Sequence, residues 1–277
     1  MLNTPLRIPN RTKTGILGLD LLLGGGFQRG RIVEVYGTEA TGKTTVAYHT
    51  VAENQERGVV IISVTEEGFY PEYAKSCGVD IEELPVILVR YVEEAIETAL
   101  DFMDTGVIQL VVIDNLNKGL YKKDDMDELG AKRGSRLTQE LGKQLAQAAH
   151  RSNATVLLTT DNKFVKSHPF WIGQQLKTTS KKRNSMEVFL TRDPESLVVG
   201  HGLSIPLTTS GVNQALHLLQ MAVAANIIEE INARYRYKEF ALGHGSTVAA
   251  AKLLQNQTLW TEISERVSTA QWEQAFL

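Results

Sequence analysis

The chain of 277 residues contains little of what several protein classes require. It has one cysteine, Cys77, which excludes an internal disulfide framework. Its formal net charge is only −3, so any binding to nucleic acid or anionic membrane has to be local. Its apolar runs are shorter than the roughly 20 residues that span a bilayer, and residues 1–13 lack the apolar core of a signal peptide. We therefore expect a cytoplasmic protein without a membrane role.

Histidine and proline are also sparse. The 6 histidines show no metal-ligand spacing, and a single cysteine cannot build a zinc site. With 7 prolines, 22 glycines, 43% hydrophobic and 22% charged residues, the composition excludes collagen, coiled coil and wholesale disorder. The apolar content is sufficient for one large domain or two modest ones.

Short β-branched runs alternate with longer helical patterns over the first two thirds of the chain. We expect strands at residues 31–36, 58–64, 86–90, 110–114, 155–160 and 186–190. We expect helices at residues 43–54, 71–76, 93–104 and 134–151. Strands that are apolar on both faces and alternate with helices predict an α/β fold with a mostly parallel sheet between helical layers.

The pattern changes after Arg192. Residues 193–210 are expected to form a loop or short strands, and a domain boundary is placed near Gly211. Beyond it we expect a helix at residues 213–231, a hairpin at 235–242 and helices at 247–255 and 258–267. The predicted organisation is a short N-terminal segment (1–13), an α/β core (14–210) and a small C-terminal α+β domain (211–277).

One segment fits the phosphate-binding pattern G-x-x-x-x-G-K-[ST] and lies between an expected strand and an expected helix. Its residues are Gly37, Thr38, Glu39, Ala40, Thr41, Gly42, Lys43 and Thr44, and Thr45 follows them. Glycines let backbone N–H groups point at phosphate oxygens, and the helix N-terminus adds partial positive charge. Lys43 would reach the β and γ phosphates, and the Thr44 hydroxyl would bind Mg²⁺.

Acidic residues follow three of the expected strands. Asp114 ends the run at 110–114 and would hold Mg²⁺ through water. Glu66 or Glu67, after the strand at 58–64, could activate the attacking water, and Glu66 is favoured. Asp161 or Asn162 follows the strand at 155–160 and could sense the γ-phosphate. Ligands of such sheets bind at the carboxyl ends of the strands, where all these residues lie.

These residues resemble the RecA family of DNA strand-exchange ATPases, in particular bacterial RecA. The resemblance extends from residues 30–37 through 66–84 to 226–245 and covers about residues 14–267. It implies a RecA-type P-loop core, a catalytic role for Glu66 beside Lys43, and oligomers or filaments with ATP at the subunit interfaces.

In this family two loops bind single-stranded DNA. By position, the first would be residues 127–134, with Lys132 and Arg133 as contacts. The second would be residues 163–177. Its predicted contacts are Lys163, Phe164, Lys166, Phe170, Trp171 and Lys177.

The charge pattern supports the second loop without the resemblance. Residues 163–192 contain seven Lys or Arg and one acid, Glu187, in a chain of net charge −3. Aromatic residues interleave with these cations, and a base stacked on an aromatic ring is worth about 1 to 3 kcal/mol while cations neutralise phosphates. The alternative is a solvated loop whose aromatics pack against a neighbouring subunit.

The sequence departs from the family pattern in three places. Residues 1–13 are shorter than the N-terminal helix and strand that dock onto the next protomer. The family's paired interface lysines have no counterpart, because residues 193–233 contain no Lys or Arg. Asp161 or Asn162 stands where the family has a sensor glutamine. The C-terminal part, with five bases and eight acids from residue 193 to 277, favours a structural or regulatory domain over duplex DNA capture.

The sequence thus predicts an ATP- and Mg²⁺-dependent, single-stranded-DNA-binding ATPase that acts in homologous recombination and DNA repair. Two alternatives remain. One is a RecA-fold regulator or motor resembling the KaiC or replicative-helicase groups. The other is an accessory subunit that binds nucleotide as a switch and caps or joins the filament of a larger recombinase partner.

Overall fold

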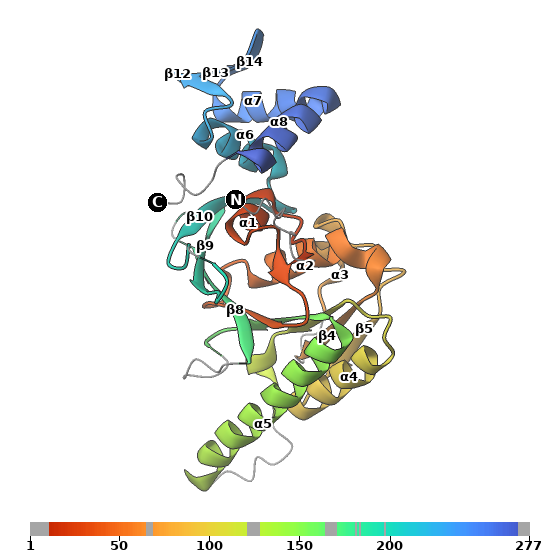
Figure 1. The fold of residues 1–277 in the computed structure, drawn as a ribbon. Coiled ribbons are helices and arrows are strands. Elements are labelled where there is room, and N and C mark those ends of the chain that lie inside the picture. The colour runs from red at the N-terminus through yellow and green to blue at the C-terminus, as the bar shows by residue number, and fades with distance from the viewer. Residues whose placement is uncertain are drawn as a thin grey trace, which may run out of the picture.

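The computed structural model describes residues 11–64, 69–120, 128–163, 171–180, 182, 184–196 and 198–270, with the side chains of 128–138 excepted. Figure 1 shows the chain as a ribbon. Its strands are β1 (Arg11–Thr12), β2 (Phe27–Gln28), β3 (Ile32–Tyr36), β4 (Val59–Val64), β5 (Val86–Val89), β6 (Leu110–Asp114), β7 (Thr155–Thr160), β8 (Ile172–Thr179), β9 (Ser185–Arg192), β10 (Gly202–Thr208), β11 (Gly211–Val212), β12 (Glu229–Ile231), β13 (Arg234–Tyr237) and β14 (Phe240–His244).

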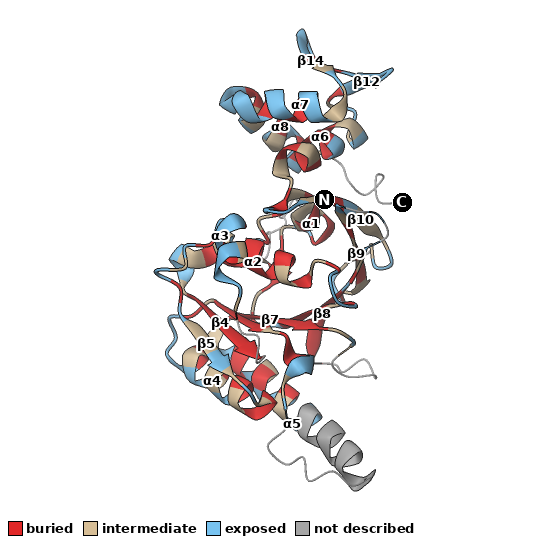
Figure 2. Cartoon of the chain, turned by 180° about the vertical axis from the view of Figure 1, so that it is seen from behind, coloured by how far each residue is buried: buried red, intermediate tan, exposed pale blue. Residues whose placement is uncertain are grey.

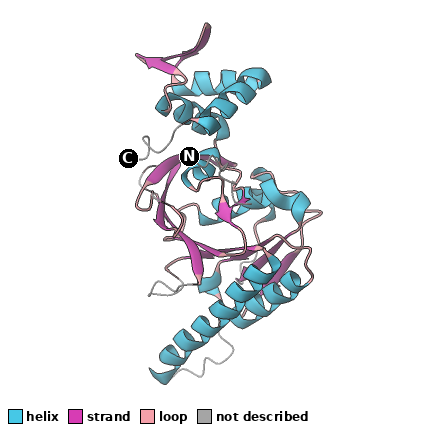
Figure 3. Cartoon of the chain, viewed as in Figure 1, coloured by secondary structure: helices cyan, strands magenta, loops and turns pink. Residues whose placement is uncertain are grey.

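The helices alternate with these strands in the first part of the chain and cluster in the last part (Figure 3). They are α1 (Leu17–Leu22), α2 (Lys43–Asn54), α3 (Pro71–Ser76), α4 (Val92–Asp104), α5 (Glu128–Ser152), α6 (Gln214–Ala224), α7 (Ser246–Gln255) and α8 (Gln257–Thr269), with short 3₁₀ turns η1 (Gln55–Arg57) and η2 (Leu116–Lys118). None of the described helices is long and apolar enough to cross a membrane.

A nine-stranded sheet forms the centre of the molecule, in the order β11-β10-β9-β8-β3-β7-β6-β4-β5. The six strands from β8 to β5 are parallel to their neighbours, and β9, β10 and β11 add antiparallel pairs. The predicted α/β class with a mostly parallel sheet is confirmed. Because parallel strands share a carboxyl edge, the carboxyl ends of β3, β4, β6 and β7 lie on one side of the sheet.

Both faces of the sheet are covered, as the buried central strands in Figure 2 show. Every residue of β4 and of β7 is buried, which their β-branched, apolar sequences favour on a sheet covered twice. Residues of α1, α2 and α3 pack on one face, and residues of α4 and α5 pack on the other.

The last part of the chain has its own apolar core, formed by α6, α7, α8 and residues of β13 and β14. These helices and a three-stranded sheet, ordered β12-β13-β14, lie together at one end of the molecule (Figure 1). The boundary predicted at Gly211 falls inside the large sheet, since β11 pairs with β10 and α6 begins only at Gln214. The strands β1 and β2 pair with each other near the start of the described chain.

Several predicted elements need correction. The helix predicted at 213–231 ends at Ala224, where Asn226 takes a left-handed φ of 55°, and β12 follows. The stretch 193–210, predicted as a loop or short strands, contains one strand, β10, which pairs with β9. The first predicted DNA loop, 127–134, is largely helical because α5 begins at Glu128. The second, 163–177, ends earlier because β8 begins at Ile172.

Two buried histidines connect the core to the chain that leads into the last helices. The Gly18 N–H donates to Nε2 of His217 at 3.0 Å, and the Val212 N–H donates to Nε2 of His49 at 2.9 Å. Both rings therefore act as neutral acceptors. Burial lowers the pKa of His217 to about 4 and also lowers the pKa of His49.

Candidate nucleotide site

The loop between β3 and α2 curls tightly because two of its glycines have no room for a side chain. A Cβ on Gly37 would lie 2.3 Å from the carbonyl oxygen of Thr178. Gly42 has a φ of +94°, and a Cβ there would lie 2.5 Å from the Met186 sulfur. Glycine at these two positions lets the loop close against β8 and β9 and start α2 directly at Lys43.

Lys43 is buried within this loop. Its ammonium donates to the carbonyl oxygens of Gly37 at 2.8 Å and Thr38 at 2.9 Å. It also lies 3.0 Å from Oδ1 of Asp161, which follows β7. The loop thus presents one buried cation at the carboxyl edge of the sheet, where an anionic ligand can reach it.

Thr44, the residue after Lys43 on α2, contacts Asp114, the last residue of β6. The Thr44 hydroxyl donates to Oδ2 of Asp114 at 3.1 Å, and the Thr159 hydroxyl donates to Oδ1 of the same carboxylate. Burial raises the pKa of Asp114 above its ordinary value. The two hydroxyl donors and the Lys43 charge oppose this shift but do not cancel it. A hydroxyl and a carboxylate in contact are hard oxygen donors of the kind Mg²⁺ prefers, so these residues fit that ion.

The other loop residues have definite positions. Glu39 forms an ion pair with Lys118 at 3.3 Å. The Thr41 hydroxyl donates to the Thr38 carbonyl and shares a 2.8 Å hydrogen bond with Thr178 of β8, while Thr45 shares one of 2.6 Å with the Tyr73 hydroxyl. Ala40 has a left-handed φ of 56°.

At the end of β7 the structure places Asp161 against Lys43 and leaves Asn162 exposed. Of the two residues considered for this position, Asp161 is therefore the one that faces Lys43, and the assignment of Asn162 as a nucleotide contact stays a prediction. Asn115 donates to Asp161 Oδ1 at 2.7 Å, and Asn117 Oδ1 accepts from the Asp161 N–H at 2.9 Å. Successive side chains point in different directions after a strand, so only one of two adjacent polar residues can face Lys43.

A cavity of about 540 Å³ opens beside the loop. Six of the described residues that line it were not identified as site residues from the sequence: Ser63, Tyr70, Tyr73, Asn115, Lys118 and Leu207. The two tyrosines lie in the segment after β4 that carried the family resemblance, and Lys118 lies four residues after Asp114. They were not identified because they lie far from the phosphate loop along the chain. Glu66 and Glu67, the predicted water-activating residues, lie outside the described residues.

The predicted DNA contacts are spread over different elements. Lys163 places its ammonium 5.4 Å from the ring centroid of Tyr36, and Lys177 is exposed on β8. Trp171 is only 5% exposed and packs on α5, where a Cβ on Gly142 would lie 2.5 Å from its ring. Its predicted role in base stacking is therefore corrected to a core role. Lys132 and Arg133 lie in α5 with side chains outside the description, and Phe164, Lys166 and Phe170 lie outside the described residues.

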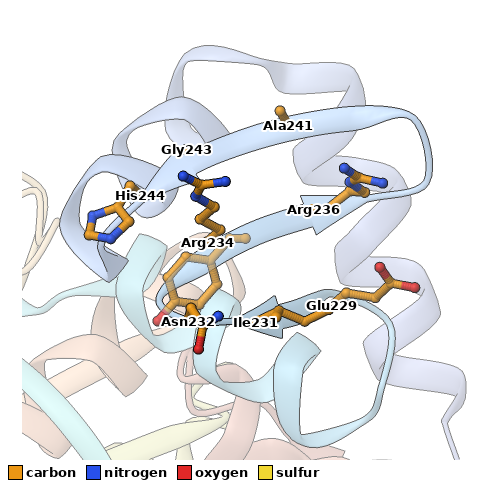
Figure 4. Close-up of a pocket in the computed structure, with 9 residues that line it drawn as sticks. Glu229, Ile231, Asn232, Arg234, Arg236, Ala241, Gly243 and His244 are labelled. Carbon is orange, nitrogen blue, oxygen red and sulfur yellow. The ribbon is translucent and has the colours of Figure 1, made fainter.

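A second cavity, of about 840 Å³, lies on the solvent face of the β12-β13-β14 sheet (Figure 4). Arg234 and Arg236 alternate with the buried Tyr235 and Tyr237 along β13, so both arginines project from the same exposed face. Glu229 pairs in register with Arg236, and His244 with Arg234. This face presents cations on exposed strands.

More than half of the chain matches a known protein family. The model of the RecA N-terminal domain matches residues 7–165, which include the phosphate loop, Asp114 and Asp161. This chain belongs to the RecA family. The fold described above, with its mostly parallel sheet and helices on both faces, is a RecA-type core.

Bacterial RecA proteins match nearly the whole chain. Protein RecA of Cereibacter sphaeroides is 28% identical over 293 aligned positions, covering 96% of this chain and 85% of that protein. Protein RecA of Aquifex pyrophilus is 29% identical and covers 92% and 81%, respectively. Protein RecA of Rhodospirillum rubrum is 30% identical and covers 92% and 77%. The match therefore includes the C-terminal helices as well as the core.

Proposed function

We propose that this RecA-family protein binds ATP with Mg²⁺, hydrolyses it, and holds single-stranded DNA in an ATP-dependent way during homologous recombination and DNA repair. The observation that carries the proposal is the convergence of Lys43, Thr44 and Asp114 in one cavity at the carboxyl edge of a RecA-type sheet. The RecA-named relatives that cover the chain support the same assignment.

Each group would have a distinct task. Backbone N–H groups at the start of α2 and the Lys43 ammonium would bind the phosphates, and Thr44 and Asp114 would hold Mg²⁺. The ion would supply charge neutralisation between the β and γ phosphates. Glu66 would orient and deprotonate the attacking water. Most of the catalysis in this arrangement comes from positioning and from fixed charges.

Single-stranded DNA would contact the segment between β7 and β8 and Lys177, near the end of β8. Lys163, Lys166 and Lys177 would neutralise phosphates, and Phe164 and Phe170 would stack on bases. Lys132 and Arg133 of α5 would add charge. The exposed Lys177 supports this placement, and the direct link from β8 to the phosphate loop through Thr178 and Thr41 gives a route by which nucleotide affects DNA binding.

The protein would act as an oligomer or filament, with DNA running along many copies. The decisive experiment measures the ATPase rate with and without single-stranded DNA, together with electron microscopy of the same samples. Stimulation by DNA and nucleotide-dependent filaments are expected. ATP hydrolysis that is indifferent to DNA would favour a RecA-fold regulator or motor, and tight nucleotide binding without turnover would favour an accessory subunit that caps or joins the filament of a larger recombinase.

A further inference from the structure

The phosphate cavity contains a second lysine that the phosphate-loop pattern does not include. Lys118 ends the short turn η2, which follows β6 directly after Asp114, and it lines the cavity beside Lys43 and Asp114. Its side chain is 36% exposed, so it lies at the mouth of the cavity and can reach a ligand inside it.

The backbone that carries Lys118 is fixed from several sides. Its N–H donates to the Asn115 carbonyl at 3.0 Å, and the side chain of Asn115 caps the turn by accepting from the Asn117 N–H. Both asparagines are also tied to Asp161 at the end of β7. On the other side, the Leu120 N–H donates to the Arg90 carbonyl at 2.9 Å. Lys118 therefore has a preorganised position at the carboxyl edge of the sheet.

The charges of the cavity indicate that a bound triphosphate would need a second cation besides Lys43. Among the described residues, the charged ones that line the cavity are Glu39, Lys43, Asp114, Lys118 and Asp161, three acids and two bases. Lys43 already contacts two carbonyl oxygens and Asp161. A triphosphate adds several negative charges to this set, so Lys118 becomes the second cation available to it.

The ion pair between Lys118 and Glu39 is easily displaced. Glu39 lies 3.3 Å from its ammonium, and the glutamate side chain is 75% exposed. An ion pair this exposed contributes little free energy because water and salt screen it. A phosphate group held inside the cavity, bearing more charge than one carboxylate, would compete well for the same ammonium.

We propose that Lys118 is the cation that binds the terminal phosphate from within the same subunit and stabilises the charge on it during transfer to water. The inference rests on the proposed ATPase function. In the step it assists, the water oxygen bonds to the γ-phosphorus while the bond to the β,γ-bridging oxygen breaks. The electron pair of that bond remains on ADP, and the water proton passes to the carboxylate proposed as base. Glu39 is the counter-ion that the terminal phosphate displaces.

The test compares Lys118→Ala with Lys118→Arg, and uses Lys252→Ala as the control because Lys252 is an exposed lysine with one hydrogen bond, to the Ala241 carbonyl. Dissociation constants are measured by calorimetry for Mg²⁺–ADP and for a Mg²⁺–ATP analogue that resists hydrolysis, and ATP turnover is measured separately. Lys118→Ala should weaken binding of the triphosphate about tenfold and leave the diphosphate nearly unchanged, because one charged contact to the terminal phosphate is lost. Turnover should fall about a hundredfold.

Two further variants sharpen the result. Lys118→Arg should keep most of the preference for triphosphate, because the positive charge remains. Glu39→Gln should strengthen triphosphate binding, because the competing carboxylate is removed. Both results are expected from charge at the cavity mouth, and the role of Lys118 requires them together with the loss of triphosphate preference in Lys118→Ala.

The outcomes separate this inference from the function on which it rests. If the unaltered protein binds neither nucleotide, the proposed ATPase function fails and Lys118 has no such role. If it binds both and Lys118→Ala retains the full preference for triphosphate, only the inference is overturned. Equal weakening of both nucleotides would assign Lys118 to the structure of the cavity and also overturn it.

Discussion

Two concave regions of this molecule present cations, and they differ in how those cations are held. In the cavity beside the phosphate loop, Lys43 is buried and fixed by two carbonyl oxygens and Asp161. On the C-terminal sheet, Arg234 and Arg236 project from β13 into solvent (Figure 4). The second cavity is larger, about 840 Å³ against 540 Å³, but its charged side chains are held less firmly.

The difference shows that volume is a poor guide to function in this protein. Parallel strands bring their carboxyl ends to one edge of the sheet. Residues far apart in the sequence therefore converge there, on backbone segments that hydrogen bonds hold in place. The antiparallel sheet β12-β13-β14 presents its arginines on an exposed strand, with a shift in register between Tyr235 and Arg236. We therefore expect substitutions in the first region to change nucleotide affinity strongly. Substitutions in the second region should leave nucleotide affinity unchanged.

The largest effect should come from Lys43→Ala. Removal of the buried ammonium eliminates a charge-assisted contact to the phosphates, so nucleotide affinity should fall at least roughly a hundredfold. Single-stranded DNA binding should then no longer respond to added ATP. Fluorescence anisotropy of a labelled oligonucleotide, with and without ATP, measures this, and circular dichroism checks that the variant is folded.

Lys252→Ala serves as the matched control for this variant, since it removes an exposed lysine of α7 that is remote from the cavity. It should bind nucleotide and DNA as the unaltered protein does. If Lys43→Ala binds DNA with the same ATP response as the parent, the coupling between the two ligands has to be abandoned.

Much of the first region could be predicted from the sequence, because the phosphate loop is one continuous segment. The spacing of Gly37, Gly42 and Lys43 fixes a backbone shape, and Asp114 ends an apolar run whose strand character is unambiguous. The positions of Asp161 and Lys118 could not be derived in the same way. Each depends on a turn after a strand, and a turn shifted by one residue exchanges the side chain that faces Lys43.

Aromatic residues gave a misleading signal for a related reason. Trp171 lies next to several cations in the sequence, which suggested a base-stacking surface. Its ring instead packs against α5 at Gly142, where the helix offers no side chain. Packing between residues 29 positions apart is set by the crossing of helix and sheet, and local composition does not encode it.

The joint between the two regions should respond to pH. His217 on α6 accepts the Gly18 N–H in its neutral form, and burial holds its pKa at about 4. An unfolded histidine binds a proton below about pH 6.5, so the unfolded chain gains protons first as the pH falls. Stability from this group is present above that pH and is lost as the pH drops toward 4. Between about pH 7.5 and pH 5 the loss should be about 2 kcal/mol.

Denaturant unfolding of the parent and of His217→Gln at both pH values measures this contribution. The variant should lose less stability on acidification, and the exposed His150→Gln should behave as the parent does. Burial raises the pKa of Asp20 to about 6, so its contribution has the opposite sign and is lost as the pH rises through 6. Both proteins contain Asp20, so it cancels in the difference. Equal pH dependence of parent and His217→Gln would contradict the assignment.

Asp161→Asn should have the opposite effect from Lys43→Ala. The Asp161 carboxylate lies 3.0 Å from the Lys43 ammonium and adds negative charge where phosphates would bind. Asparagine keeps an oxygen that can accept from Asn115 and removes that charge, so nucleotide affinity should rise about tenfold at low salt. Asp104→Asn, which alters an exposed carboxylate 4.0 Å from Arg151, is the control for a lost surface charge. Weaker binding by Asp161→Asn would mean that this carboxylate helps to hold Mg²⁺.

The smallest effect on nucleotide should come from the double change Arg234→Ala and Arg236→Ala. Both side chains are exposed on β13. This strand belongs to the last part of the chain, which has its own apolar core. Nucleotide affinity should change less than about twofold, because exposed charges separated by more than a Debye length are largely screened. Calorimetry with Mg²⁺–ADP checks this at two salt concentrations. A larger, salt-independent loss would show that the C-terminal sheet and the phosphate cavity are coupled through the fold, because neither screened charge nor local packing on an open strand can produce it.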